Sequence, residues 1–149
     1  MVDQARILVV DDDENVAKTL SAILEEKGYS VETAKDGKEA IEKSSKRYYD
    51  LALIDIRLPD MEGTELLTSM KETVPKMVKI VVTGYPSLQN AVEAVNKGAD
   101  AYIIKPVNLE NLLDIVKTRL KRQQESKKYT EERVAEFIET RARNLEQSS

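Results

Sequence analysis

Four apolar stretches of the chain each end in polar residues, at the point where a buried strand would stop. Asp11 to Asp13 follow the first stretch, Asp55 follows the second, Thr83 ends the third and Lys105 follows the fourth. Carboxylates, a hydroxyl and an amine would therefore meet if these stretches were neighbouring parallel strands. The carboxyl ends of such strands share one edge of the sheet, which is where open α/β folds bind ligands.

Clustered carboxylates repel one another unless a cation joins them. In the strand order 2-1-3-4-5, strands one and three are adjacent, so Asp11, Asp12 and Asp55 would converge. Mg²⁺ suits such a site because it needs few protein oxygens and usually shares its site with a phosphate, and Mn²⁺ can replace it. Lys105 and Thr83 would supply the positive charge and the hydrogen-bond donor that the phosphate needs. The residues together predict a phosphoryl site.

The elements that would position these residues alternate regularly along the chain. Short apolar runs alternate with helical patterns, which predicts βα units around a parallel sheet. The expected fold is an α/β, flavodoxin-like, doubly wound sheet of five parallel strands with helices on both faces, the second strand lying at an edge. The expected strands are residues 6–10, 30–34, 51–54, 78–82 and 101–104, and the fifth helix begins after Asn108.

Composition excludes several classes of function. The 149 residues are 41% apolar and carry a net charge of −4, which predicts one domain with no basic field for nucleic acid or anionic lipid. Without histidine or cysteine the chain has no triad base, no ordinary zinc site and no disulfide. No run is long enough to span a bilayer, and the first ten residues lack a secretory signal, so we expect a cytoplasmic protein without membrane contact.

Four ordered motifs resemble a known family. The stretches VVDDD, LIDIRLPDMEG, VVTGYP and YIIKP are similar to the motifs of the receiver domains of two-component response regulators. The resemblance runs from about Arg6 to Leu120, so we expect a receiver domain over residues 4–121 and a charged helical tail or linker over residues 122–149. It implies a phosphorylation-controlled signalling switch that catalyses only its own phosphorylation and dephosphorylation.

The resemblance assigns roles to the residues of the site. Asp55 would accept a phosphoryl group from a histidine kinase or phosphotransfer protein, and its carboxylate would be the nucleophile. Asp12 would bind Mg²⁺ directly and Asp11 mainly through water, with Asp55 and the backbone carbonyl of Arg57 as further ligands. Lys105 would pair with the phosphoryl oxygens.

The resemblance also implies a switch. Thr83 would bind a phosphoryl oxygen and move toward phosphorylated Asp55, and the space vacated would let the aromatic ring of Tyr102 turn inward. The face that would change includes the helix over about residues 87–97, the fifth strand and the last helix. This face would control a downstream protein partner or output domain. The family typically has a cis peptide bond before the residue that matches Pro106.

Three further positions near the site have expected roles. Arg57 and Tyr85 overhang the acceptor in this family, and we expect them to slow hydrolysis of the acyl phosphate by partly shielding it from water. Asp13 extends the acidic pair to three, and an N-cap of the first helix is favoured over a third metal ligand.

Two other functions compete with this interpretation. In a haloacid-dehalogenase-like phosphatase Asp11 would be the nucleophile and Asp13 the acid, but Asn15 does not fit that motif and no cap domain is present. A pseudo-receiver that binds proteins without phosphate is expected to lack at least one residue of the site. Calcium binding of the EF-hand type is rejected because Val16 replaces the glycine that its loop requires.

The tail leaves several alternatives open. Thr130 is a credible helix start, and Val134, Phe137, Ile138, Arg141 and Leu145 form a short, mostly apolar stripe. A packed or frayed terminal helix and a helix that binds a partner or forms a dimer are equally compatible with this pattern, and a homodimer that depends on phosphorylation is one expected state. The chain is either a stand-alone receiver or the first part of a longer regulator.

Overall fold

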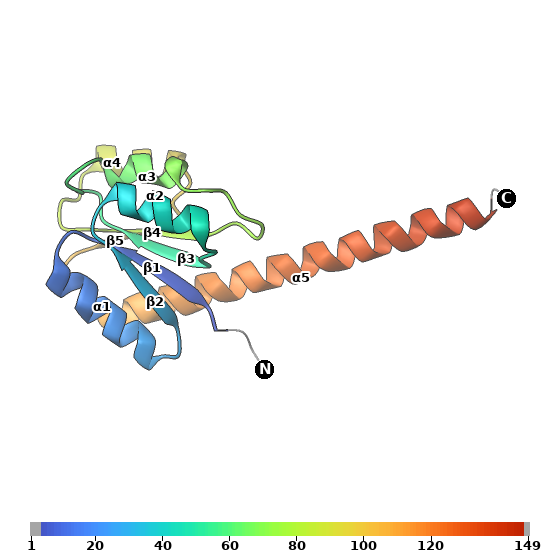
Figure 1. Ribbon diagram of the computed structural model, residues 1–149, viewed down its shortest axis with the longest axis horizontal. Coiled ribbons are helices and arrows are strands. Elements are labelled where there is room, and N and C mark those ends of the chain that lie inside the picture. Colours follow the sequence, from blue (N-terminus) through green and yellow to red (C-terminus); the bar gives the residue numbers. More distant parts are fainter. Residues whose placement is uncertain (1–3, 148–149) are drawn as a thin grey trace.

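The computed structural model describes residues 4–147 and contains one parallel sheet of five strands in the order β2-β1-β3-β4-β5 (Figure 1). The predicted fold class and strand order are confirmed. The strands are β1 (Arg6–Val10), β2 (Ser30–Ala34), β3 (Leu51–Ile54), β4 (Val78–Thr83) and β5 (Ala101–Ile104). The helices are α1 (Glu14–Glu26), α2 (Gly37–Lys46), α3 (Gly63–Ser69), α4 (Leu88–Asn96) and α5 (Leu109–Gln147).

Helices cover both faces of the sheet, which explains why its central strands are mostly apolar; Lys79 of β4 is a buried exception, and its Nζ donates to the carbonyl of Leu67. Ile7 and Val9 belong to the apolar core beneath α1 and α5, whereas Leu8 and Val10 belong to the core beneath α2, α3 and α4 (Figure 1). Successive side chains of a strand point to opposite faces, so a strand with two covered faces needs apolar residues at most positions. β2 is only partly buried and lies at the edge of the sheet, as predicted.

The register of the strands sets the position of the polar residues that follow them. Val10 of β1 lies opposite Ile54 of β3, so the next residue of each strand, Asp11 and Asp55, comes out at the same edge. The backbone amide of Asp55 donates to the carbonyl of Val10 at 3.0 Å, which continues the pairing up to the acceptor position. The pairing of β4 with β5 likewise places Lys105 beside Thr83, because the Lys105 amide donates to the Thr83 carbonyl at 2.8 Å.

The last helix is longer than the sequence analysis predicted. α5 runs without interruption for 39 residues, and its second half extends away from the sheet (Figure 1). The expectation that a separate helix starts at Thr130 was wrong, because the Thr130 hydroxyl donates to the carbonyl of Ser126 inside the continuous helix at 2.9 Å. The chain contains neither glycine nor proline after Pro106, so nothing in this region interrupts the backbone hydrogen bonds.

Candidate phosphoryl and metal site

Three carboxylates meet at the carboxyl ends of β1 and β3. Asp11, Asp12 and Asp55 each bring an oxygen to within 4.8 Å of the others. Asp11 and Asp55 are buried and Asp12 is exposed, so the cluster opens toward solvent on the side of Asp12. All three donors are hard carboxylate oxygens, which is the ligand set that suits Mg²⁺ and excludes soft metals.

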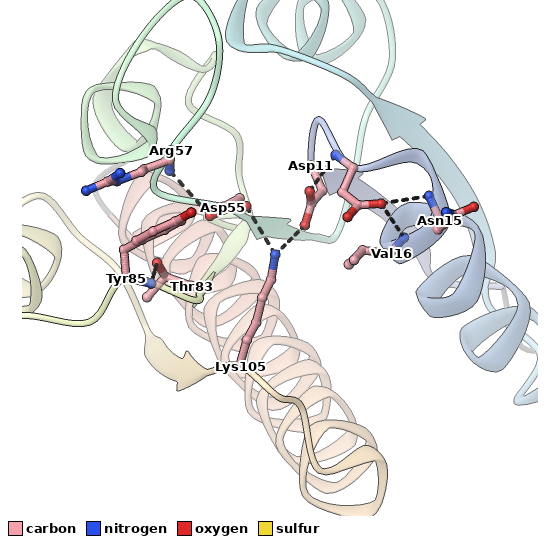
Figure 2. Close-up of polar contacts among 9 residues, drawn as sticks. Asp11, Asn15, Val16, Asp55, Arg57, Thr83, Tyr85 and Lys105 are labelled. Atoms are coloured by element: carbon pink, nitrogen blue, oxygen red, sulfur yellow. Dashed lines mark hydrogen bonds and ion pairs between the residues drawn. The ribbon is translucent and has the colours of Figure 1, made fainter.

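A single lysine bridges the two buried carboxylates. The Nζ of Lys105 lies 2.8 Å from Oδ2 of Asp11 and 3.1 Å from Oδ2 of Asp55 (Figure 2). The peptide bond between Lys105 and Pro106 is cis. The cluster therefore holds three carboxylates and one ammonium. Its excess negative charge favours the binding of a divalent cation.

The pKa values of Asp55 and Lys105 are both raised above their ordinary values. Burial raises the pKa of the Asp55 carboxyl, the charge of Asp11 adds to this rise, and the hydrogen bond and charge of Lys105 oppose it without cancelling it. Burial by itself lowers the pKa of Lys105, but its hydrogen bonds and ion pairs with Asp11 and Asp55 outweigh burial and raise that pKa. Lys105 is therefore fully charged at neutral pH.

The third aspartate of the acidic run has a structural role. The side chain of Asp13 accepts hydrogen bonds from the backbone amides of Asn15 and Val16 at the start of α1, at 3.0 and 3.2 Å. This is the N-cap that the sequence predicted. The Asp13 amide in turn donates to Oδ1 of Asp11 at 2.9 Å, so the start of α1 also fixes the orientation of a carboxylate in the cluster.

Thr83, Tyr85 and Arg57 lie on the other side of Asp55. Thr83 is fully buried at the end of β4, and its Oγ1 accepts the backbone amide of Tyr85 at 3.0 Å. The guanidinium of Arg57 lies over the ring of Tyr85, 3.9 Å from its centroid (Figure 2). The Arg57 amide donates to Oδ1 of Asp55 at 3.3 Å. The pair forms a cation–π contact at the edge of the site.

Tyr102 is connected to the start of α4 by a residue that the sequence analysis did not identify. Its hydroxyl donates to the side-chain oxygen of Asn90. The side chain of Asn90 also forms a capping box with Ser87 and donates to the carbonyl of Tyr85 at 2.8 Å. The spacing of Ser87 and Asn90 is that of a capping box and gives a weak sequence signal for this connection. The signal is weak because a capping box usually has Glu or Gln, and not Asn, at the second position.

Two other residues that sequence reasoning missed hold the loop after Asp55. Gly63 begins α3 against the backbone of this loop, and a Cβ added there would lie 2.0 Å from the carbonyl oxygen of Asp55. The carboxylate of Asp60 accepts the backbone amides of Gly37 and Lys38 at 2.9 Å, which ties the loop to the start of α2. Both contacts join segments far apart in sequence, so only the DMEG part of the motif hints at them.

An apolar surface lies beside the site on α4 and β5. Leu88, Val92, Val95 and Ile104 are exposed there, with Leu88 at 83% and Val95 at 68%. Side chains of this size are seldom left exposed in a group unless they contact another molecule. None of the helices in residues 4–147 is both long enough and apolar enough to cross a membrane.

Known proteins that are similar to this chain belong to the response regulators. The family model described as "Response regulator receiver domain" matches residues 7–117. The transcriptional regulatory protein ZraR of Escherichia coli O157:H7 is 40% identical over 110 residues, which cover 74% of this chain and 25% of ZraR. The response regulator ArlR of Staphylococcus aureus strain Mu50 is 33% identical over 118 residues, which cover 79% of this chain and 53% of ArlR.

A solved structure resembles the chain over most of its length. The crystal structure of a CheY-like response regulator receiver domain protein from Methanospirillum hungatei JF-1 superposes with a TM-score of 0.80 and 48% sequence identity. The match covers 83% of this chain and 99% of that protein. The chain therefore spans nearly all of a receiver domain protein, but only about a quarter of ZraR and half of ArlR.

Proposed function

Because this chain belongs to the family of response regulator receiver domains, we propose that Asp55 is its phosphoryl acceptor and that phosphorylation controls the surface formed by α4, β5 and α5. The single observation that carries the proposal is the contact of one ammonium, on Lys105, with two buried carboxylates from separate strands. The phosphatase alternative is not favoured, since the receiver family matches residues 7–117. The pseudo-receiver alternative is not favoured because no residue of the site is missing: Asp11, Asp12, Asp55, Thr83 and Lys105 are all present.

The phosphodonor is a histidine kinase or a phosphotransfer protein. An Asp55 oxygen attacks the phosphorus of the donor's phosphohistidine, an O–P bond forms, the P–N bond breaks, and the electron pair returns to the imidazole. The backbone amide of Arg57 and the ammonium of Lys105 hold the Asp55 carboxylate in one orientation before the reaction. The chain contains no histidine, so the donor is a separate protein or domain.

The residues of the site fit a magnesium ion. Asp11, Asp12 and Asp55 would hold it together with the backbone carbonyl of Arg57, and Mn²⁺ can take its place. When bound, the ion neutralises the charge that develops on the phosphoryl oxygens. Three carboxylates against one ammonium leave a net negative charge, so without a cation the site would repel the dianionic phosphoryl group.

Lys105 and Thr83 recognise the phosphoryl group after transfer. Lys105 exchanges its contact with Oδ2 of Asp55 for a phosphoryl oxygen and keeps its contact with Asp11. The Thr83 hydroxyl donates to a second phosphoryl oxygen, which draws the end of β4 toward Asp55.

Movement of Thr83 is passed to α4 through Tyr102. The Tyr102 hydroxyl and the amide of Asn90 link the ring to the first turn of α4 and to the carbonyl of Tyr85. When the ring turns inward this bond breaks, and the first turn of α4 loses a contact that fixes its position. The exposed apolar side chains of α4 and β5 then bind a downstream protein partner or an output domain. Direct binding of nucleic acid by this chain is not part of the proposal.

Arg57 and Tyr85 slow the loss of the phosphoryl group. Their stacked side chains lie beside Asp55 and obstruct the approach of water to the acyl phosphate. In this proposal the chain catalyses only its own phosphorylation and the hydrolysis of its own acyl phosphate. The proposed place of action is the cytoplasm.

The test is incubation of the chain with a small phosphodonor and Mg²⁺, followed by measurement of the intact mass. The native chain is expected to gain one phosphate, and Asp55→Asn none. Asp13→Asn is the matched control, because asparagine keeps the N-cap of α1 and leaves the three clustered carboxylates in place. Phosphate on Asp55→Asn, or on Asp11 in the native chain, would refute the assignment and support the phosphatase-like chemistry.

A further inference from the structure

The extended half of α5 has two different faces. One face is polar and includes Glu139 and Arg143, which form an ion pair at 2.6 Å. Another face carries Val134, Phe137 and Ile138, whose side chains are 51%, 65% and 61% exposed. Three large apolar side chains on one unpaired helix favour contact with another molecule.

Two residues of the apolar face, Val134 and Ile138, follow the spacing of a coiled coil together with the charged Glu131 and Arg141, and Phe137 lies beside this seam. Glu131, Val134, Ile138 and Arg141 are separated by three, four and three residues, so they line one seam. The seam has an unusual symmetry about residue 136. Glu131 and Arg141 lie five residues before and after it, and Val134 and Ile138 lie two residues before and after it.

We propose that this seam pairs two copies of the chain as antiparallel helices around a twofold axis at residue 136. In that arrangement Glu131 faces Arg141 of the second copy, Val134 faces Ile138 of the second copy, and each contact occurs twice. A parallel pair in register would instead place Glu131 against Glu131 and Arg141 against Arg141, which is repulsive. The charge pattern therefore indicates that the helix bound to this face belongs to a second copy of the chain and that it runs antiparallel.

A cavity beside α5 lies at the position that residue 147 of the second helix would reach in the antiparallel pair. A cavity of about 890 Å³ lies between α5 and the amino-terminal edge of the sheet, with Lys127, Lys128 and Glu131 on the α5 side and Tyr48 and Pro75 on the other. In the antiparallel pair, residue 147 of the second copy lies level with residue 125, because each is eleven residues from residue 136. The described part of the second helix, up to residue 147, thus reaches the cavity without overlapping the sheet.

The pairing is independent of the proposed phosphorylation. Gln123 anchors α5 to the sheet edge, with its Nε2 donating at 2.9 Å to the carbonyls of both Asp50 and Lys76. This edge is opposite the one that carries Asp55, so the seam and the phosphoryl site lie on different sides of the domain. The native chain and Asp55→Asn are both expected to dimerise without a phosphodonor.

Charge exchange tests the direction of the helices. In sedimentation equilibrium the native chain is expected to have twice the mass of one chain. Glu131→Arg and Arg141→Glu should each raise the dissociation constant by about tenfold, because each creates two like-charge contacts. The double variant exchanges the charges and should return the dissociation constant to within about threefold of the native value. A native chain that is monomeric at every concentration, or a double variant no tighter than the single variants, would overturn the proposal.

Cysteine crosslinking provides a second readout, since the chain has no cysteine of its own. Glu131→Cys alone should not crosslink, because the two sulfurs would lie about 15 Å apart along the antiparallel helices. Glu131→Cys combined with Arg141→Cys should crosslink two chains under mild oxidation. Rapid crosslinking by Glu131→Cys alone would show parallel helices and refute the model. The thermal unfolding midpoint of each variant checks that the domain remains folded.

Discussion

Replacement of Gly63 by alanine tests how the acceptor loop is held. Gly63 lies where α3 begins, and its amide donates to the carbonyl of Ile56 at 2.6 Å. An added Cβ would lie 2.0 Å from the carbonyl oxygen of Asp55, 2.8 Å from its carbonyl carbon and 2.9 Å from the Cα of Ile56. All three are backbone atoms, so no side-chain rotation can relieve the contacts.

The cost follows from the distance that the backbone must move. The Cβ–oxygen separation has to grow from 2.0 Å to at least the 3.4 Å of ordinary contact. The loop cannot give way easily, because the Asp55 amide is bonded to β1 and the carboxylate of Asp60 is bonded to α2. Forcing extra atoms into a well-packed site costs about 3 kcal/mol, which exceeds the gain of up to about 1 kcal/mol from alanine in a helix. We expect Gly63→Ala to lower the free energy of unfolding by about 2 kcal/mol.

Urea denaturation measures this change, and Gly84→Ala is the matched control. A Cβ at Gly84 would meet only the flexible side chain of Lys105, at 3.8 Å and beyond, so the free energy of unfolding should change by less than about 1 kcal/mol. Because the clash at Gly63 displaces the backbone of Asp55 itself, Gly63→Ala should also slow phosphorylation by a small phosphodonor. Equal stability losses in the two variants, or a loss of less than about 0.5 kcal/mol for Gly63→Ala, would refute the argument.

Three further predictions concern other parts of the molecule. Gln123→Leu removes the side-chain donor from the carbonyl of Lys76 and from that of Asp50, which keeps the amide of Val78, and it should lower the free energy of unfolding by about 1 to 3 kcal/mol in urea denaturation, a cost that a loosely attached α5 would not show. Arg57→Ala and Tyr85→Ala should each raise the rate of acyl phosphate hydrolysis several-fold, measured by loss of the phosphate mass, and unchanged rates would contradict the shielding role. Burial and the hydrogen bond to Glu32 raise the pKa of Tyr49 from 10.0 to about 12. The folded state therefore binds the phenol proton more tightly than the unfolded state does. The stability that the neutral phenol contributes is complete below pH 10 and is lost as the pH rises through 12. Tyr49→Phe should remove this part of the pH dependence of the free energy of unfolding.

The parts of the fold that follow from local pattern could be predicted from the sequence. Strands covered on both faces are mostly apolar, so β1, β3 and β4 stand out against the helices between them even though β4 contains the buried Lys79. Once the strand order is set, the register brings Asp11 and Asp55 to the same edge without further information. The N-cap role of Asp13 is equally local, because it depends on two backbone amides within the next three residues, those of Asn15 and Val16.

The parts that depend on contacts between distant loops could not be predicted. Asp60 follows the acceptor by five residues, yet its partners lie at the start of α2, and no rule of spacing connects the two. The role of Asn90 likewise depends on how β5 packs beside α4. The error at Thr130 has a different origin. A threonine before two acidic residues suits a helix start, but inside a continuous run of helix-forming residues the backbone bonds on both sides outweigh that preference.

The path of α5 places the phosphoryl site and the proposed dimer contact at opposite edges of the sheet. The helix begins just after Lys105 and Pro106 at the edge of the phosphoryl site, packs its Leu112 and Val116 into the core, and leaves from the opposite edge at Gln123. A dimer built on the extension therefore leaves Asp55 accessible to a phosphodonor and leaves the apolar side chains of α4 and β5 uncovered. Two receivers held at the ends of one antiparallel pair would present two such surfaces at once, so a partner with two matching sites would bind more tightly than one with a single site.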